Sequence, residues 1–580
     1  MKRLLALLCL FCCPPCWPTA AMAAAPPPDG DIVVFSAADI QRMSVRTIQD
    51  LLNLAPGVKA GDSSVSIRGD SAVAVYLDGM SLINNISAHK SVNWGLVSLE
   101  DVELIKVIKG GGAVSFGDNS SGGVIVITSK KAARAKAGVE VEAGNHDYWK
   151  TSANVSQRAG AWGVSANGEL ESTDGFRPND DEKHRRAGFK LSYAPEAWLA
   201  WAGPDGQAPT LALDYGHTER GNPGLPGYAT PHARSRDEAL GLSLNLGAKG
   251  YKSTSSFTNF QNEFENTDTA ADTMLRGWTV QEDLRKSYDL PLLGRTAFGA
   301  LISHTAASGN KIAGVDEQAY SLFANKKLGL KPLPLSLAMG LRANAYSQFD
   351  GALNPELRLS WTRGPARLEA GFQMTNNTPS IRQRYYETTS TRPNPDLGSE
   401  SSANYSLGAS YQPLKWLGGN ATVFRNNIDD RITYMRVGGV GRYENVGRSH
   451  LSGVDASLSI TPWAWLSLRP SYTYLEAIDD TSGLWLPAKP RHKLMIDLQL
   501  RPLDGLMLGL TVAHCSEVFT NAANSAIAPA YEEIDLRGEY QYKNARVYFR
   551  VENLADADYL YADGYPAPPR TWLVGLGWDF

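Results

Sequence analysis

Residues 571–580 read TWLVGLGWDF, and this stretch shows the pattern that decides the fold. Side chains of a β-strand point alternately to its two faces, so every second residue shares a face. One face here carries only large apolar residues, which are Trp572, Val574, Leu576, Trp578 and Phe580. The opposite face carries mostly small or polar residues. The segment is therefore predicted to be a strand with its apolar face in a hydrophobic environment.

The same alternation recurs through most of the chain. In residues 546–552 the apolar Val547, Phe549 and Val551 alternate with charged or polar side chains, and residues 494–501 repeat the pattern. Turn clusters of Gly, Pro, Asn and Asp separate such stretches from about residue 138 onward. A soluble β-sandwich would also alternate, but it would not need charges on one face in strand after strand. That arrangement indicates a wide, water-filled lumen.

The length of the alternating region predicts the size of the barrel. About 440 residues, at about 20 per strand and loop, give roughly 22 strands, a size class whose lumen is plugged. We therefore predict an all-β membrane protein whose transmembrane barrel spans residues 137–580.

Composition excludes other classes. The mean hydropathy is −0.26, and after the first 23 residues no apolar run is long enough for a membrane-spanning helix. The net charge of −4 argues against nucleic acid as a partner. The nine histidines are scattered and no HExxH or phosphate-binding motif occurs, so we expect no enzyme activity.

The first 23 residues are predicted to be a secretory signal peptide. Lys2 and Arg3 precede the apolar run 4–11, and the small residues end in an A-x-A-like site at Ala23. Four of the five cysteines lie in this peptide, so disulfides cannot hold the mature chain together. Cys515 is interpreted as a buried or inert thiol rather than a nucleophile or metal ligand.

Residues 30–132 differ from the rest of the chain in their pattern of apolar residues and are predicted to form a small mixed α/β domain. The spacing of Ile48, Leu51 and Leu52 fits a short helix that Pro56-Gly57 stops. Short apolar strands are predicted around it, at residues 65–67, 73–77, 102–108 and 124–128. We expect this domain to fill and close the barrel lumen.

Several short motifs follow one another in an order that resembles the TonB-dependent outer-membrane transporters. They are residues 48–52 (IQDLL), 67–69 (IRG), 75–79 (VYLDG), 102–110 (VELIKVIKG), 116–128, 394–397 (NPDL), 443–447 (YENVG) and 551–554 (VENL). The resemblance covers essentially the whole mature chain. It implies an N-terminal plug inside a barrel in the outer membrane of a Gram-negative bacterium, in contact with outer-membrane lipid.

The resemblance also implies function and partners. Such proteins import a scarce small-molecule metal chelate, drawing energy from the inner membrane through TonB, ExbB and ExbD. The leading expectation is an iron–siderophore complex, in which iron is cargo. Cobalamin is the alternative, because the chain is short and close in size to corrinoid transporters. A ligand receptor or gated pore that does not use TonB remains a third hypothesis.

The segment that should contact TonB has two interpretations. In this family a short Ton box near the mature N-terminus pairs with a strand of TonB. Within residues 24–37, the stretch Asp31, Ile32, Val33 and Val34 has a suitable composition for a degenerate Ton box. By its position just before Asp39-Ile40 it is instead the first strand of the plug, which is the interpretation we favour.

The resemblance assigns further roles to single residues. Arg68, Glu103 and Lys109 are expected to join plug and barrel through ion pairs. Trp578 and terminal Phe580 resemble the signal that the barrel assembly machinery recognises.

Ligand contacts are expected on the plug apex and the outer loops, where arginine and aromatic residues would suit an anionic chelate. The candidates are Asn84, Asn85, His89, Trp94, Arg220, Tyr228, Arg382, Tyr385 and Tyr386. No firm cofactor is expected. Asp174, Asp180 and Asp181, with Glu182 beside them, could hold Ca²⁺ in a loop, although a solvated acidic turn is the simpler interpretation.

Overall fold

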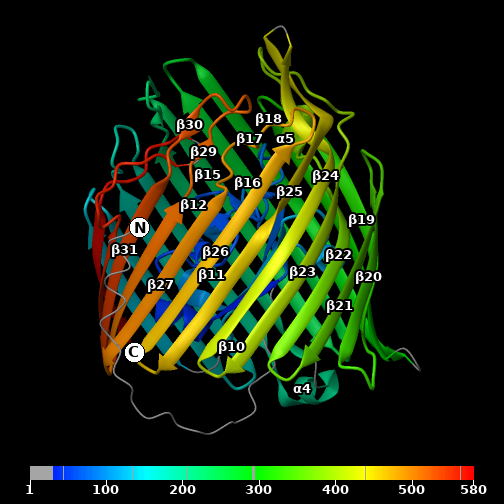
Figure 1. Cartoon of the computed structure of the whole chain (residues 1–580), viewed down its shortest axis with the longest axis vertical. Helices are drawn as coiled ribbons and strands as arrows, with labels where there is room; N and C mark the ends of the chain where they lie inside the picture. Colours follow the sequence, from blue (N-terminus) through cyan, green and yellow to red (C-terminus); the bar gives the residue numbers. More distant parts are fainter. Residues whose placement is uncertain are drawn as a thin grey trace.

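The computed structural model describes residues 31–580, apart from 44, 133–134, 204–205, 291–293, 438 and 562–563. Its dominant feature is a closed antiparallel barrel, which has 22 strands within this part of the chain (Figure 1). The ring closes where β33 (Thr571–Asp579) pairs with β8 (Lys136–Gly144). The predicted fold class and strand number are confirmed. The predicted signal peptide and residues 24–30 lie outside the described residues.

The remaining barrel strands follow each other around the wall. They are β9 (Trp149–Ala159), β10 (Trp162–Thr173), β11 (Glu182–Tyr193), β12 (Gln207–Gly221), β15 (Ala233–Ala248), β16 (Tyr251–Asn266), β17 (Ala271–Leu290), β18 (Gly294–Gly309), β19 (Val315–Gly329), β20 (Leu335–Tyr346), β21 (Ala352–Arg363), β22 (Ala366–Asn377), β23 (Glu400–Leu414), β24 (Leu417–Val437), β25 (Val440–Trp463), β26 (Leu466–Asp479), β27 (His492–Leu503), β28 (Leu506–Cys515), β31 (Tyr531–Tyr542) and β32 (Ala545–Glu552).

The two ends of the barrel differ. At one end, called the turn end, strands are joined by tight turns such as 249–250 and 504–505, and the C-terminus and α4 (Glu196–Ala202) lie there (Figure 1). At the other, the loop end, the connections include 378–399 with α5 (Ile381–Tyr385). Small hairpins occur in two loops, formed by β13 (Gly224–Leu225) with β14 (Tyr228–Ala229) and by β29 (Val518–Phe519) with β30 (Ile527–Ala528).

The faces of the wall are arranged as the alternation predicts. On β33, Trp572, Val574 and Leu576 point outward and are about half exposed, at 49%, 47% and 55%. Leu573 points inward and is buried, and the ring of Tyr548 fills the space beside Gly575. Polar residues such as Ser402 and Gln373 are buried inside the barrel instead. An apolar outer surface with a polar interior suits a wall surrounded by lipid.

The plug fills the barrel with a small mixed domain. Its elements are β1 (Ile32–Ser36), α1 (Ala37–Met43), α2 (Ile48–Asn53), β2 (Val58–Ala60), β3 (Val65–Ile67), β4 (Val73–Leu77), β5 (Met80–Ser81), the 3₁₀ turns η1 (Trp94–Leu96) and η2 (Leu99–Asp101), β6 (Val102–Lys109), α3 (Ala113–Phe116) and β7 (Gly123–Ser129). Five strands form one sheet in the order β1-β6-β7-β4-β5. The largest apolar cluster of the described residues lies on this sheet.

Local sequence explains the plug helix that was predicted. Thr47 caps α2, because its hydroxyl accepts from the Asp50 N–H while the Asp50 carboxylate accepts from the Thr47 N–H. Ile48, Leu51 and Leu52 form the buried face of this helix. Helices α1, α3, α4 and α5 were not predicted, because each has only four to seven residues and lacks the combination of apolar spacing and a Pro-Gly stop that indicated α2. No helix among the described residues is long and apolar enough to cross a membrane.

Candidate functional site

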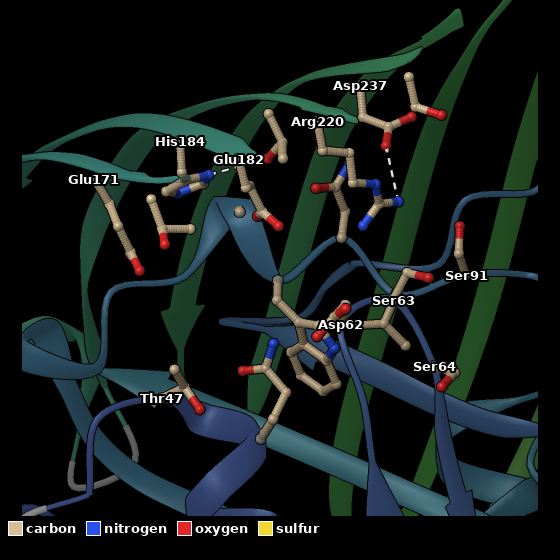
Figure 2. A pocket seen from close by; sticks show the side chains of 18 of the residues that line it. Thr47, Asp62, Ser63, Ser64, Ser91, Glu171, Glu182, His184, Arg220 and Asp237 are labelled. Carbon is tan, nitrogen blue, oxygen red and sulfur yellow. Dashed lines mark hydrogen bonds and ion pairs between the residues drawn. The ribbon is translucent and has the colours of Figure 1, made fainter. Parts of the chain in front are cut away.

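A large cavity lies between the plug and the barrel wall at the loop end. Its volume is about 1160 Å³, and we call it the outer cavity. Plug residues 46–49, 62–64 and 84–99 line one side. The loop ends of the surrounding strands, together with residues 568–573, line the other. In Figure 2 the side chains of Glu171 and Glu182 from the barrel and Asp62 from the plug point into the same space.

The outer cavity carries more carboxylates than cations. Lys150 pairs with Glu169 at 3.0 Å, and Arg220 pairs with Asp237 at 3.4 Å (Figure 2). The charged lining residues are Asp62, Glu169, Glu171, Asp180, Glu182, Asp237, Glu263 and Glu552 against Arg46, Lys150, Arg220 and Arg382. In the part of the chain described, the carboxylates of Asp62, Glu171, Glu182 and Glu552 accept no hydrogen bond and form no ion pair. The cavity is therefore acidic on balance.

Arg46 of the plug interacts electrostatically with several acids, among them Glu171 and Glu552 of the outer cavity. Its guanidinium lies 5.5 Å from the centre of the Tyr148 ring. Burial alone would lower its pKa, but Glu552, Tyr148 and neighbouring acids raise the pKa of Arg46 well above its ordinary value. Its Nε atom is buried without a hydrogen-bond partner among the described residues. Arg46 is thus a cation whose charge the neighbouring acids stabilise.

The structure brings most of the predicted ligand residues together. Asn84, His89, Trp94, Arg220, Arg382 and Tyr386 all line the outer cavity. Trp94 is buried, and its indole N–H donates to the Gly61 carbonyl at 3.1 Å, so part of its role is structural.

Three predicted ligand residues lie elsewhere. Asn85 lines a separate cavity of about 150 Å³. Tyr228 is 82% exposed in the β13–β14 hairpin, away from the outer cavity. Tyr385 packs against the plug core. Sequence alone could not show which way these side chains point.

The plug apex, residues 82–93, contacts the loop that carries Arg382 and Tyr386. Helix α5 in that loop begins with a capping box formed by Ser380 and Gln383. The Ile381 N–H donates to the Asn85 carbonyl at 3.1 Å, and Lys90 Nζ donates to Thr378 Oγ1 at 2.9 Å. A ligand that moves this loop would therefore act directly on the plug.

The proposed Ca²⁺ ligands are engaged with protein groups. Asp181 accepts two hydrogen bonds from Arg234, at 3.0 and 2.8 Å, and Asp180 accepts from the Phe176 N–H at 3.2 Å. Asp174 donates its backbone N–H to the His146 carbonyl. Among the residues described, no group of three His, Cys, Asp or Glu side chains has the arrangement of a metal site. Calcium binding stays a prediction.

Opposite the outer cavity, the plug is joined to the barrel by a buried ion-pair network. Asp455 of β25 accepts from Arg68 Nε at 2.8 Å and pairs with Lys109 Nζ at 3.2 Å. Arg68 also binds Asp31 of the plug at 2.8 Å. The side chains of all four residues are at most 6% exposed. Sequence reasoning had identified Arg68 and Lys109 but not their partner.

Further hydrogen bonds surround this network. Asp118 accepts from Asn344 at 2.8 Å, and Asp70 accepts from Asn426 at 2.8 Å. Further such contacts to strands β19 to β27 are Asn325–Ser115, Asn377–Ser121, Ser406–Asp31 and Lys493–Val58. We call this side of the plug the anchored face.

Glu103 does not form the expected ion pair. Its side chain is exposed on β6 and makes no ion pair within the described residues, because the alternation of β6 turns it away from the core. Its neighbours contact the barrel instead. Glu100 accepts from Ser152 at 2.8 Å and Asn154 at 3.0 Å, and Asp101 pairs with Lys190 at 2.6 Å.

A second cavity, of about 710 Å³, lies below the outer one toward the turn end, and we call it the inner cavity. It lies between plug residues 37–46 and 98–102 and barrel strands β8–β10 and β31–β33. Four residues line both cavities, which are Arg46 and Leu99 of the plug and Lys150 and Glu169 of the barrel. We call these four residues the constriction.

Comparison with known families identifies the chain. A sequence model described as the TonB-dependent receptor plug domain matches residues 29–124. A second, described as the TonB-dependent receptor-like β-barrel, matches residues 134–554. The chain belongs to the TonB-dependent receptor family. It is therefore a protein of the Gram-negative outer membrane, and it belongs to a family of transporters and receptors and not of enzymes.

Individual relatives are distant but match over nearly the full length. The vitamin B12 transporter of Photobacterium profundum is 22% identical, with 95% of this chain and 92% of the relative covered. An iron-regulated outer membrane virulence protein of Vibrio cholerae is also 22% identical, over 94% and 91%. The ferric enterobactin receptor of Pseudomonas aeruginosa has a TM-score of 0.78 at 18% identity, covering 95% of this chain and 98% of that one.

Family membership orients the molecule. In bacterial outer-membrane barrels the long loops face outside and the short turns face the periplasm. The outer cavity of this TonB-dependent receptor thus opens outside, and the inner cavity lies toward the periplasm. Trp578 and Phe580 lie at the periplasmic end with exposed side chains, 48% and 71%. Their role in barrel assembly stays a prediction.

The candidate TonB segment is built into the plug of this TonB-dependent receptor. Ile32, Val33 and Val34 belong to β1, which pairs antiparallel with β6, and Asp31 is buried against Arg68. The favoured interpretation of this stretch as the first plug strand agrees with that pairing. β1 is nevertheless at the edge of its sheet, where a further strand could pair. A separate Ton box before residue 31 would lie outside the described residues.

Proposed function

We propose that this TonB-dependent receptor imports a metal chelate across the outer membrane, with the outer cavity as its binding site. TonB, with ExbB and ExbD, would supply the work needed to move the plug. The observation that carries the proposal is that the plug and the outer loops of the barrel line the outer cavity together. A ligand there would touch both the plug apex and the loop that carries Arg382 and Tyr386. The apex and this loop are hydrogen-bonded to each other. Binding outside could thus be signalled to the plug.

The charge of the outer cavity supports a particular kind of chelate. Eight carboxylates and four Lys or Arg side chains line it, and clefts of one sign raise the local concentration of oppositely charged ligands. The arginines that suggested an anionic chelate are outnumbered by these carboxylates, so a neutral or cationic chelate suits the charge of the outer cavity better. A ferric siderophore of the hydroxamate type meets this condition, and it is our leading candidate. Cobalamin, which carries no net charge as cyanocobalamin, is the second.

Binding and uptake assays test the proposal. Purified protein is titrated with a cationic ferric trihydroxamate, a trianionic ferric tricatecholate and cyanocobalamin. We expect the cationic or the neutral ligand to bind most tightly, with weaker binding of the cation at high salt. Preference for the tricatecholate would contradict the charge argument.

Uptake of the bound ligand is then compared in cells with and without TonB. Loss of uptake without TonB is expected. Undiminished uptake there would instead support the third hypothesis, a receptor or gated pore that does not use TonB.

A further inference from the structure

The polar contacts around the plug are distributed unevenly, and the two cavities lie on one side only. The outer cavity borders β9–β12, β15–β17, β32 and β33, and the inner cavity continues below it along β8–β10 and β31–β33. Both cavities are lined by Arg46, Leu99, Lys150 and Glu169. On the opposite side, Asp455, Arg68 and Lys109 fill the space between plug and wall with a buried network. The first side has two large cavities that meet at a narrow point, whereas a cavity of about 150 Å³ lies toward β17–β20.

We propose that the ligand crosses between the plug and the wall of β8–β10 and β31–β33, through the constriction, while the plug stays docked on its anchored face. This inference rests on the proposed import function and adds the route. The plug residues Arg46 and Leu99 then act as the movable side of a gate, and the Lys150–Glu169 pair is its fixed side.

The contacts at the constriction are of a kind that can open. Arg46 lies against the Tyr148 ring, and its Nε has no hydrogen-bond partner in the described chain. Lys150 and Glu169 come from adjacent strands of the barrel, so their ion pair does not tie the plug to the wall. Withdrawal of residues 45–47 and η2 would therefore join the two cavities without separating that pair.

The plug contacts that must break are few and lie close to the constriction. Glu100 and Asp101 in η2 hold Ser152, Asn154 and Lys190 of the wall. Water in the adjoining inner cavity can replace those bonds as the plug moves. On the anchored face, by contrast, separation would leave Asp455 buried without its two cations and Lys109 without its carboxylate, while Arg68 would keep only Asp31.

A reducible cross-link tests the route. In a Cys515→Ser background, Leu99→Cys is paired with Lys150→Cys, and a short bis-methanethiosulfonate reagent links plug to wall across the constriction. The matched control links the anchored face through Ser115→Cys and Asn325→Cys, whose native side chains are hydrogen-bonded at 3.0 Å. Uptake of radiolabelled ferric trihydroxamate and cyanocobalamin is measured in cells before linking, after linking and after reduction. Binding to the outer cavity is measured in parallel.

We expect the constriction link to lower uptake by about tenfold or more, with binding retained and uptake restored by reduction, since a blocked conformational step limits the whole cycle. The anchored-face link should leave uptake within about twofold. Normal uptake with the constriction linked, or equal loss with either link, would overturn the route. Failure of the unlinked variants and the parent to take up either ligand would instead count against the proposed function.

Discussion

The anchored face and the cavity side of the plug meet the same barrel by different means. On the anchored face, charged groups such as Arg68, Lys109 and Asp455 are buried and satisfied by one another. On the cavity side, carboxylates such as Glu171 and Glu182 face open volume. A buried charge is stable only while its partners stay in place, whereas a solvated charge tolerates movement. The difference indicates which side is fixed and which side can move.

The height of the barrel wall varies around the plug. Strands β24 and β25 on the anchored side have 21 and 24 residues, β16 and β17 beside the outer cavity have 16 and 20, and β32 and β33 beside it have 8 and 9. At about 3.3 Å per residue the longer strands extend far beyond the plug. The short strands give a lower wall beside the outer cavity, where residues 568–573 line it.

Removing the central carboxylate should produce the largest effect. Asp455→Asn leaves Arg68 and Lys109 buried with only Asp31 as a nearby acid, and loss of one partner of a buried pair costs about 3–5 kcal/mol. We expect the free energy of plug unfolding to fall by that amount in urea titrations of purified protein, followed by protease sensitivity of the plug.

The control for Asp455→Asn is Glu171→Gln, since that carboxylate forms no ion pair in the described chain and faces the outer cavity. A change within about 0.5 kcal/mol is expected for it. Equal losses for both variants would remove the distinction between the two sides.

Much of the fold could be predicted from alternation and turn residues, because a barrel strand must present one face to lipid and the other to a wet lumen. The short helix of Ile48, Leu51 and Leu52 also followed from local spacing. Helix α5 could not be predicted, since it has five residues and is positioned by its contact with the plug apex. Tertiary contact, not local propensity, decides such elements.

A smaller effect is expected from the plug contact on the cavity side. Glu100→Ala removes the acceptor of the Ser152 and Asn154 hydrogen bonds, and a bond to a charged group contributes about 1.5–3 kcal/mol at most. Amide hydrogen exchange of residues 98–102 should become faster while exchange around Lys109 stays unchanged.

Glu103→Ala serves as the matched control for Glu100→Ala. Its side chain is exposed on the next element and forms no ion pair in the part of the chain described. Exchange should be unaltered by this change. Faster exchange around Lys109 in Glu100→Ala would mean that the two sides are coupled rather than independent.

The smallest effect concerns ligand charge. Glu182→Gln removes one partly buried carboxylate from the outer cavity, and single charge interactions across a solvent-filled space contribute about 0.2–1 kcal/mol. Affinity for a cationic ferric trihydroxamate should fall by a few-fold at low salt, and the difference from the parent protein should shrink when salt is added. Glu265→Gln, an exposed acid outside the cavity, should leave affinity unchanged. A gain in affinity with Glu182→Gln would contradict the charge argument.

The candidate site was less predictable than the fold. Arginines and aromatics near the apex were visible in the sequence, and Arg220, Arg382 and Tyr386 do line the outer cavity. Asp62, Glu171 and Glu182 come from three separate segments, so their meeting in one space depends on the docking of the plug. The partner of Arg68 was hidden for the same reason, since Asp455 lies 387 residues further along the chain.

Distance measurements in living cells test the central claim most directly. Pairs of spin labels are placed at Leu99 and Lys150 across the constriction, and at Ser115 and Asn325 across the anchored face. Electron–electron distances are recorded with bound ligand in cells that contain or lack TonB. The account predicts that the first distance lengthens and broadens only when TonB is present, while the second stays unchanged. A change across the anchored face that equals or exceeds the change across the constriction would contradict it.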